Sequence, residues 1–410
     1  MGLLDYLRRE FSFINGNYRI LIISWIIMDL AMEMPVPNYQ YYVQALGGAE
    51  FPIALGLIGL ANFLAMAAVA FPGGYLADKY GRRWLITTMT FGLAASFIFF
   101  ALAPSWHFIL IGSVTQSLCL IYQPALFAMV QDSLPPERRG VGSSLIQMIH
   151  GTFNTPGPVI GGILLLYFGL VSSMRIIYSV VMVLFLIAAI WRLRLQETIT
   201  NSNTERIRLR YFFSHYPRAV KECFGACSNV SRSVVWLIVV QIMFMFSNAL
   251  FNVINAVYAR DVLLIPENMW WLTFIPLLIT MVIFSFPIGK MVDRFGSKIP
   301  LLVGPLVLGI AMLLFVGGDF YTVMIAMSLQ SLVFLLVMSP SMALTARLVG
   351  PENRGKVRGV LGFMGYVFTA VGMLLGNVLY DVWSPLPFYV VTSLTIPMVL
   401  IILLRIHDHN

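Results

Sequence analysis

Charged residues are scarce in this chain. Aspartate, glutamate, lysine and arginine make up 11% of its 410 residues, whereas hydrophobic residues make up 59%. A soluble domain contains about 25% charged residues, because its surface must stay hydrated. This shortage and a mean hydropathy of +0.85 exclude a soluble globular protein and predict a membrane protein.

Cysteine is scarce as well, with three residues. Cys119 lies in an apolar stretch, and Cys223 and Cys227 stand four residues apart in a polar one. We expect reduced thiols there, since a metal site would need further ligands. No loop combines a nucleophile, a base and oxyanion donors, which argues against a membrane enzyme. The sequence implies no cofactor.

The first residues, MGLLDYLRREFSF, contain neither the long apolar run nor the small-residue cleavage site of a signal peptide. Their mixture of apolar and charged side chains suits a short amphipathic helix on the cytoplasmic membrane surface. A frayed tail is the alternative.

Long apolar runs are abundant. A helix that spans a bilayer needs roughly 20 mainly apolar residues, and polar breaks divide the chain into twelve such segments. We place them near residues 19–45, 52–76, 84–103, 106–131, 141–168, 172–193, 233–260, 268–289, 299–316, 320–346, 357–380 and 386–404. Six lie on each side of one long polar stretch. This predicts a six-helix bundle at 19–193, a linker at 194–232 and a second six-helix bundle at 233–404.

Lysine and arginine predict the orientation of these bundles. If both termini are cytoplasmic, 24 of the 26 basic residues fall on the cytoplasmic side, and Arg175 and Arg260 fall on the other. Eight of the 24, Arg192 among them, are counted with the central loop. The bias predicts a multi-pass protein of the cell membrane, with cytoplasmic segments at 1–18, 194–232 and 405–410. It also explains the net charge of +8 through contact with anionic lipid rather than nucleic acid.

A short cassette occurs twice in the chain. Residues 71–83 read FPGGYLADKYGRR and residues 286–298 read FPIGKMVDRFGSK, with their identities at a constant offset of 215. The same offset carries Gly157 and Gly161 onto Gly372 and Gly376, and Arg139 onto Arg354. The chain is therefore two copies of one unit, which in a membrane protein predicts a two-lobed machine that moves.

The loop GYLADKYGRR resembles the signature loop of the major facilitator superfamily. The resemblance extends over the whole chain and implies an all-α integral membrane fold, with twelve transmembrane helices in two pseudo-symmetric six-helix bundles. It also implies that the loop latches the two halves in the outward-facing state. The residues assigned to this conformational gate are Gly74, Asp78, Gly81, Arg82, Arg83, Asp132 and Arg139, with Gly289, Asp293 and Gly296 from the second half. Within it, Gly81 can supply the positive φ of a tight turn.

A second motif lies in the fifth predicted span. Gly157, Pro158, Gly161 and Gly162 form a GPxxGG core that resembles the antiporter signature of drug exporters, although Phe153 stands where the fuller pattern has glycine. Small residues four apart allow close helix approach, so we assign these residues, with Gly372 and Gly376, to helix packing. A general packing face is the alternative to an antiporter motif.

Two carboxylates lie deep in a predicted span. Asp29 and Glu33 are four residues apart and share a helix face, about 15 and 21 Å from Arg19 along the helix. An intramembrane carboxylate usually marks an ion or substrate path. Burial and a second nearby acid both favour protonation, so one of the pair can exchange a proton near neutral pH. We therefore predict proton coupling at Asp29 and Glu33, with His150 as a third member at similar depth.

Neutral polar residues recur in other spans and are the predicted substrate-binding set. These are Tyr39, Gln116, Tyr122, Gln123, Asn154, Gln241, Asn248, Asn252 and Asn255. Asn248 corresponds to Glu33 by the 215 offset, so the first half titrates where the second offers an amide. No lysine or arginine is expected at mid-membrane, which disfavours small anions. We expect a cavity that is acidic on one wall and lined elsewhere by amides, aromatics and methionines.

The sequence thus predicts a monomeric secondary transporter that works by alternating access, with the lipid bilayer, protons and a small-molecule substrate as its partners. Proton-coupled export, or antiport, of amphipathic or cationic small molecules is the leading interpretation. A proton symporter or uniporter for a neutral metabolite such as a sugar is the first alternative. A divalent metal exporter using Asp29, Glu33 and His150, and a non-transporting membrane receptor, are the others.

Overall fold

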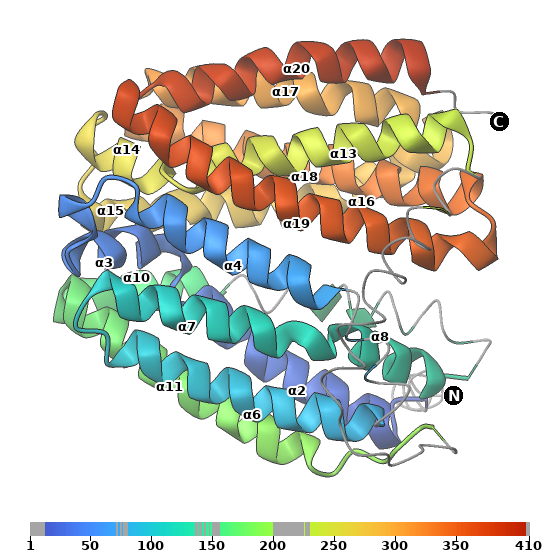
Figure 1. Ribbon diagram of the computed structural model, residues 1–410. Helices are drawn as coiled ribbons and strands as arrows, with labels where there is room; N and C mark the ends of the chain where they lie inside the picture. Colours follow the sequence, from blue (N-terminus) through green and yellow to red (C-terminus); the bar gives the residue numbers. More distant parts are fainter. Residues whose placement is uncertain are drawn as a thin grey trace, which may run out of the picture.

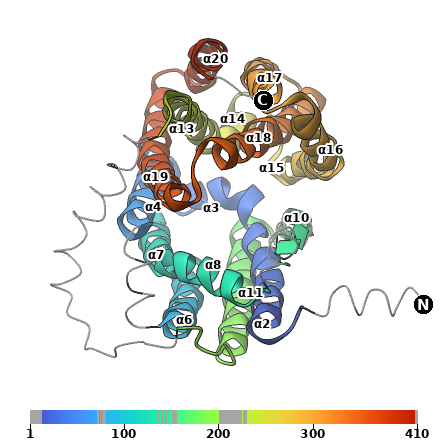
Figure 2. The ribbon, with the colours of Figure 1, turned by 90° about the vertical axis from the view of Figure 1, so that its right-hand side faces the viewer.

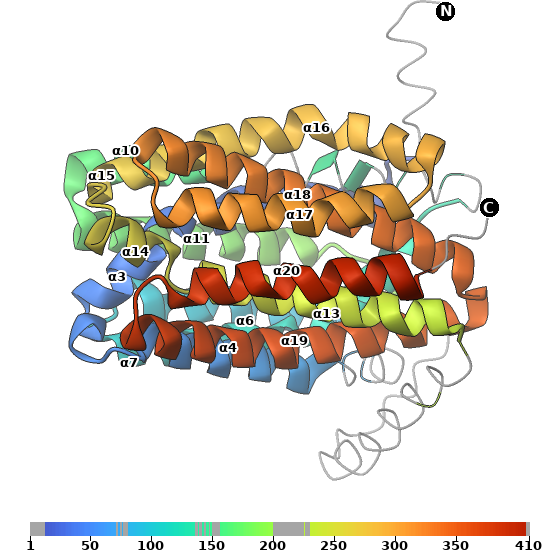
Figure 3. The same cartoon turned by 90° about the horizontal axis from the view of Figure 1, so that it is seen from above.

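The computed structural model describes residues 13–70, 73, 76, 81–135, 138, 142, 145–146, 148–149, 156–199, 225 and 230–406, without the side chains of 351–354. Throughout these residues every regular element is a helix. Long helices run side by side in roughly one direction (Figure 1 and Figure 3). α2 begins and α20 ends at the same end of the molecule, on the right in Figure 1. We call this the terminal end and the opposite one the distal end.

The helices form two lobes (Figure 2). The N-terminal lobe contains α2 (Gly16–Glu33), α3 (Tyr39–Ala45), α4 (Ala54–Ala70), α6 (Arg82–Ala101), α7 (Trp106–Cys119), α8 (Gln123–Asp132), α10 (Pro156–Phe168) and α11 (Leu170–Arg192). The C-terminal lobe contains α13 (Arg232–Asn252), α14 (Asn255–Asp261), α15 (Glu267–Trp270), α16 (Phe274–Phe295), α17 (Lys298–Val316), α18 (Phe320–Leu348), α19 (Pro351–Val382) and α20 (Leu386–Arg405).

These helices account for the predicted spans. Ten helical stretches of the described chain are long and apolar enough to cross a membrane, and two shorter apolar helices, Ala54–Ala70 and Pro156–Phe168, lie beside residues outside the described ranges. Together they fall one for one on the twelve predicted segments, which confirms the fold class. The eighth predicted segment was too short, because α16 continues through Pro287 and ends only before Gly296.

Several spans are broken before they reach the distal end. The first span is divided into α2, the 3-10 helix η1 (Val36–Asn38) and α3, because Pro35 and Pro37 lack the N–H groups that a continuous helix needs. The seventh span breaks between α13 and α14. By the 215 offset the two breaks occupy equivalent places. A break leaves backbone N–H and C=O groups free for other partners.

Glycines set the distance between helices within each lobe. A Cβ on Gly157 would lie 2.6 Å from the Glu33 Cβ and 3.0 Å from the Leu30 carbonyl, so α10 packs directly on α2. The offset partner of Gly157, Gly372, would place a Cβ 3.0 Å from the Phe246 carbonyl on α13. These close approaches suit the packing role predicted for the two glycines, and they repeat between the lobes.

Lateral junctions join the lobes at the distal end. Asn377 of α19 contacts Gly56 of α4, and Gly162 of α10 lies against the indole of Trp271 in the 3-10 helix η5 (Trp271–Thr273). Gly56 and Trp271 are 215 residues apart, and so are Gly162 and Asn377. The duplication therefore places a glycine opposite a larger side chain at both junctions, with the roles exchanged.

Candidate functional site

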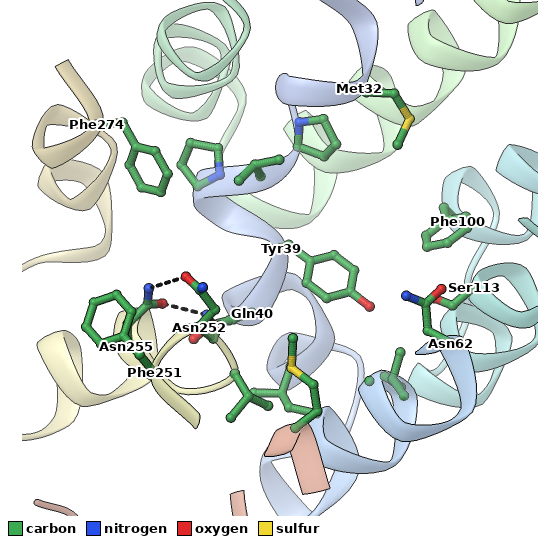
Figure 4. A pocket seen from close by; sticks show the side chains of 18 of the residues that line it. Met32, Tyr39, Gln40, Asn62, Phe100, Ser113, Phe251, Asn252, Asn255 and Phe274 are labelled. Atoms are coloured by element: carbon green, nitrogen blue, oxygen red, sulfur yellow. Dashed lines mark hydrogen bonds between the residues drawn. The ribbon is translucent and has the colours of Figure 1, made fainter. Parts of the chain in front are cut away.

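A cavity of about 490 Å³ lies between the lobes where the helix breaks meet. Its walls come from α2, η1 and α3, from α4, α6, α7 and α11, and from the C-terminal helices α13 to α16, α18 and α19. Tyr39 points across it toward Asn62 and Ser113 (Figure 4). Ser113 is about 10 Å along α7 from its distal start at Trp106, so the cavity reaches toward mid-membrane.

The lining of this central cavity is neutral. Its amides are Gln40, Asn62, Gln116, Asn252, Asn255 and Gln330. Its aromatic residues are Tyr39, Phe63, Phe97, Phe100, Tyr178, Phe251, Trp270 and Phe274, and its methionines are Met32, Met327 and Met373. None of the described lining residues carries a charged side chain. Such a surface suits amphipathic molecules with aromatic parts, which stack on rings and hydrogen-bond to amides.

The expected acidic wall is wrong for the described lining. The Cβ of Glu33 lies against Gly157 of α10, whereas its neighbour Met32 lines the cavity. Glu33 therefore packs at the α2–α10 contact and is absent from the described lining of the cavity. Asp29, on the same helix face, is half-buried. His150 lies outside the described residues.

The predicted substrate-binding residues do not all gather at one site. Tyr39, Gln116, Asn252 and Asn255 line the central cavity. Asn248 lies behind it and accepts a hydrogen bond of 2.9 Å from the Gln330 side chain. Three others lie elsewhere: Gln241 is buried in α13, Tyr122 is buried in the N-terminal lobe, and Gln123 lines a second cavity. Asn154 lies outside the described residues.

The second cavity, of about 500 Å³, lies between α4, α8 and α19. Its walls include Gln123, Phe127 and Tyr366, and also Lys356 and Arg358. The two basic residues stand at the beginning of the span Gly355–Val382. The second cavity is thus cationic at one rim, unlike the central one.

Arg192 was counted with the central loop in the tally of basic residues, although the predicted span 172–193 contains it, and the structure agrees with the span. It is the last residue of α11 and is 0% exposed. Its Nε donates to Ser24 Oγ and its Nη1 donates to Thr90 Oγ1, both at 2.9 Å. The guanidinium carbon also lies 5.5 Å from the centre of the Tyr122 ring. A buried arginine therefore connects α2, α6 and α11 within the N-terminal lobe.

The repeated cassette keeps its glycine turn in both halves. Gly81 and its offset partner Gly296 have φ of 92° and 79°, which confirms the positive φ predicted for Gly81. Gly289 has no neighbour that an added Cβ would meet within 4 Å, and Asp293 is exposed. Gly74, Asp78 and Arg139 lie outside the described residues.

The basic residues after Gly81 bind within their own lobe. Arg82 forms an ion pair with Asp132. The Arg82 and Arg83 backbone N–H groups donate to the Glu197 carboxylate at 3.2 and 3.0 Å, and the Arg83 guanidinium donates to the Leu193 carbonyl at 3.1 Å. Glu197 was not predicted, because it lies in the segment assigned to the linker. These contacts join α6 to α8 and to the chain after α11.

At the distal end a third junction joins α3 to α14 across the lobe boundary. The Tyr41 hydroxyl donates to the Ala256 carbonyl at 2.9 Å. Arg260 donates to Gln44 at 2.5 Å and to Glu267 at 2.8 Å, and its guanidinium carbon lies 5.4 Å from the centre of the Tyr41 ring. The lobes are therefore held together at the distal end.

Two lobes related by one offset, with broken spans around a central cavity, are the architecture that the sequence resemblance implied. The model of the Major Facilitator Superfamily matches residues 21–263 and 237–410. This chain belongs to the Major Facilitator Superfamily. Its relatives are transporters, so this superfamily member is a membrane transport protein rather than an enzyme.

Curated relatives in the superfamily match at low identity. The uncharacterized transporter YqjV of Bacillus subtilis is 29% identical over 150 residues, 36% of this chain and 35% of its own length. A Na⁺, Li⁺, K⁺/H⁺ antiporter of Planococcus maritimus is 24% identical, covering 47% and 45%. The chain thus spans less than half the length of these two. Multidrug resistance protein MdtH of Salmonella arizonae is 23% identical, covering 90% and 87%.

Solved structures of the superfamily share the fold. A mutant of the nucleoside transporter NupG superposes with a TM-score of 0.75 at 11% identity, covering 96% of this chain and all of that one. The human organic anion transporter MFSD10 superposes with a TM-score of 0.68 at 18% identity, covering 94% and 98%. These likenesses confirm the facilitator architecture.

Proposed function

We propose that this facilitator is a secondary transporter that exports amphipathic small molecules in exchange for protons. The neutral central cavity, with its aromatic and amide lining, carries this proposal. Polarizable methionines and flat rings adapt to varied ligands, as a multidrug site requires. Uncharged amphipathic compounds fit this lining better than cations do, because none of its described residues offers a carboxylate.

The acids of the first span supply the proposed proton site. Glu33 is one residue from Met32, which lines the cavity, and lies at the point where α2 ends. Protonation of Glu33 or Asp29 would change the charge in the α2–α10 contact beside the helix break. Proton binding can therefore alter how the first span packs without direct contact between proton and substrate. The name of the multidrug resistance protein MdtH supports a role with varied small molecules, and that of the Planococcus antiporter supports proton exchange.

We propose that the terminal end faces the cytoplasm, as the basic residues indicate. The distal junctions would then close the cavity on the outside, and alternating access would require them to part. In this orientation Arg260 lies at the outer surface. It is one of the two basic residues that the positive-inside bias does not place on the cytoplasmic side.

Inside-out membrane vesicles with an imposed pH gradient test this function, with the aromatic dye Hoechst 33342 as the probe. Tyr39→Ala should lower the transport rate about tenfold, since about 1.5 kcal/mol of hydrogen-bond and packing energy is lost at the cavity. Tyr167→Ala is the matched control, because Tyr167 is 79% exposed at the distal end of α10. Equal rates in the two variants would contradict the assignment of the cavity.

A sugar symporter remains the second candidate, because six amides in one cavity also suit hydroxyl-rich ligands. Radiolabelled sugar uptake in the same vesicles distinguishes the two functions. Uptake that the dye cannot inhibit would favour the symporter.

A further inference from the structure

Helix starts at two distal junctions lack a capping residue of their own. The first N–H groups of a helix have no partner within the helix, and a Ser, Thr, Asp or Asn before it usually accepts from them. Asp319 does this for α18, accepting from the Thr322 N–H at 2.9 Å. By contrast, Ile53 precedes α4 and Ile254 precedes α14. An isoleucine side chain has no acceptor.

The cap of α4 comes from the opposite lobe. Asn377 of α19 is 3% exposed, and its Oδ1 accepts from the Gly56 N–H at 2.7 Å. Gly56 is the third residue of α4, the position that a capping side chain normally reaches. The Asn377 Nδ2 also donates to the Pro52 carbonyl at 2.7 Å. The Asn377 side chain, from the C-terminal lobe, therefore pairs with one backbone N–H group and one backbone carbonyl at the start of α4, in the N-terminal lobe.

The reverse arrangement occurs at α14. The Gln40 Oε1 accepts from the Ala256 and Val257 N–H groups at 3.1 and 3.3 Å. The Gln40 Nε2 donates to the Asn252 carbonyl, where α13 ends, at 2.7 Å. It also donates to Asn255 Oδ1 at 2.7 Å (Figure 4). Asn255 Oδ1 also accepts from the Ala256 N–H at 2.7 Å, so the Val257 N–H depends most on Gln40.

We infer that Gln40 and Asn377 are reciprocal caps, each supplied by one lobe to a helix of the other, which hold the distal end closed. This inference rests on the proposed alternating-access transport. When the lobes part, each amide leaves its helix start, and water must replace it. Because amides are neutral, this part of the closing energy does not change with pH, so the proton-dependent step belongs to another part of the molecule.

Gln40 has a second role that Asn377 lacks, because Gln40 also lines the central cavity. A ligand that hydrogen-bonds to the Gln40 amide competes with α14 for it. Occupation of the cavity therefore weakens one cap and favours distal opening. Gln40 acts as a positioning residue that links occupancy of the cavity to opening of the distal end. Asn377 affects only how strongly the distal end is held closed.

Distances between spin labels at Leu102 and Tyr321 test the caps in the full-length, detergent-solubilised protein with its cysteines replaced by serine. These positions are 70% and 73% exposed and lie at the distal ends of opposite lobes. Gln40→Ala and Asn377→Ala should each move the closed-to-open ratio about fivefold toward open, the usual effect of losing one cap. Asn377→Ser, too short to bridge both groups, should shift it in the same direction.

Asn17→Ala is the matched control, since the Asn17 side-chain amide of α2 donates to the Gln196 carbonyl and accepts from the Gln196 N–H, both at 2.8 Å, away from the lobe boundary and the cavity. It should leave the ratio unchanged. Hoechst 33342 titrations should then separate the two caps: Gln40→Ala alters both dye affinity and turnover, whereas Asn377→Ala alters turnover at an unchanged affinity for the closed form. Unchanged distances in both cap variants, or an equal shift in Asn17→Ala, would overturn the inference.

Failure of the caps can be distinguished from failure of the proposed transport function. If wild-type protein opens and closes, and the caps shift that ratio, but no proton-driven dye transport occurs, the function fails and the caps stand. If transport is proton-driven and the cap variants leave the distances unchanged, only the caps fail.

Discussion

Arg192 is a cation that the N-terminal lobe encloses completely. Removing a guanidinium from water costs several kcal/mol unless its donors find partners. Here hydroxyl groups from two helices accept at 2.9 Å, and the Tyr122 ring faces the charge. The Nη2 atom has no hydrogen-bond partner among the described residues. The planar fork reaches Ser24 and Thr90 at once, which a single ammonium group does not match.

Arg192→Lys should therefore destabilise the protein by about 2–4 kcal/mol, because at least one charge-assisted hydrogen bond is lost and a buried charge remains. Thermal unfolding in detergent measures this. Arg194→Lys is the control, since Arg194 is exposed and stacks on Trp191 at 4.3 Å. Similar melting temperatures for the two variants would show that the enclosed contacts contribute little.

For single residues, the sequence predicted which residue types lie at the cavity, but it predicted only part of their geometry. Tyr39, Gln116, Asn252 and Asn255 were expected at the cavity and do line it. Gln40 was missed, because its role depends on a helix start in the other lobe. The contact of the Glu33 Cβ with Gly157 could not be predicted either, since it depends on how α10 packs against α2.

Among the elements, the α2–α10 pair shows how glycine spacing determines helix packing. A Cβ on Gly161 would collide with the Met34 carbonyl, and a Cβ on Gly157 with Glu33. Backbone atoms cannot move aside as a flexible side chain can, so α10 would have to shift. The GPxxGG core predicted close helix packing from the sequence, because only small residues permit such an approach, but it did not indicate α2 as the partner.

Gly161→Ala should destabilise the protein by about 1–3 kcal/mol through this collision. Gly362→Ala is the matched control, because Gly362 lies inside α19 with nothing within 4 Å of an added Cβ. That change should be neutral or stabilising by about 0.5–1 kcal/mol, as alanine favours helix. Unfolding temperatures in detergent compare them, and equal losses would contradict the packing described for α10.

The helix breaks were harder to predict than the packing. Residues 19–45 were expected as one span, although Pro35 and Pro37 divide it. The break between α13 and α14 contains no proline. There the chain is held by Gln40, from the other lobe, which no local pattern in residues 233–260 reveals.

In the whole molecule, residues that are 215 positions apart correspond in sequence, and some of them are also in contact. Gln40 donates a hydrogen bond to Asn255, and Tyr41 donates one to Ala256. Each pair is 215 residues apart, as contacting residues near a pseudo-two-fold axis must be. The duplication was visible in the sequence and predicted the two lobes. Which end of the lobes is closed could not be predicted, because the residues of the cassettes and of the distal junctions are the same in every conformation.

The central claim is that protons drive transport through Asp29 and Glu33. Hoechst 33342 transport by protein reconstituted in liposomes, under an imposed pH gradient, tests it most directly in the Asp29→Asn, Glu33→Gln double variant. The account predicts that the gradient accelerates dye transport by the wild type and no longer accelerates it in the folded double variant. Gradient-driven transport at the wild-type rate in that variant would contradict the claim.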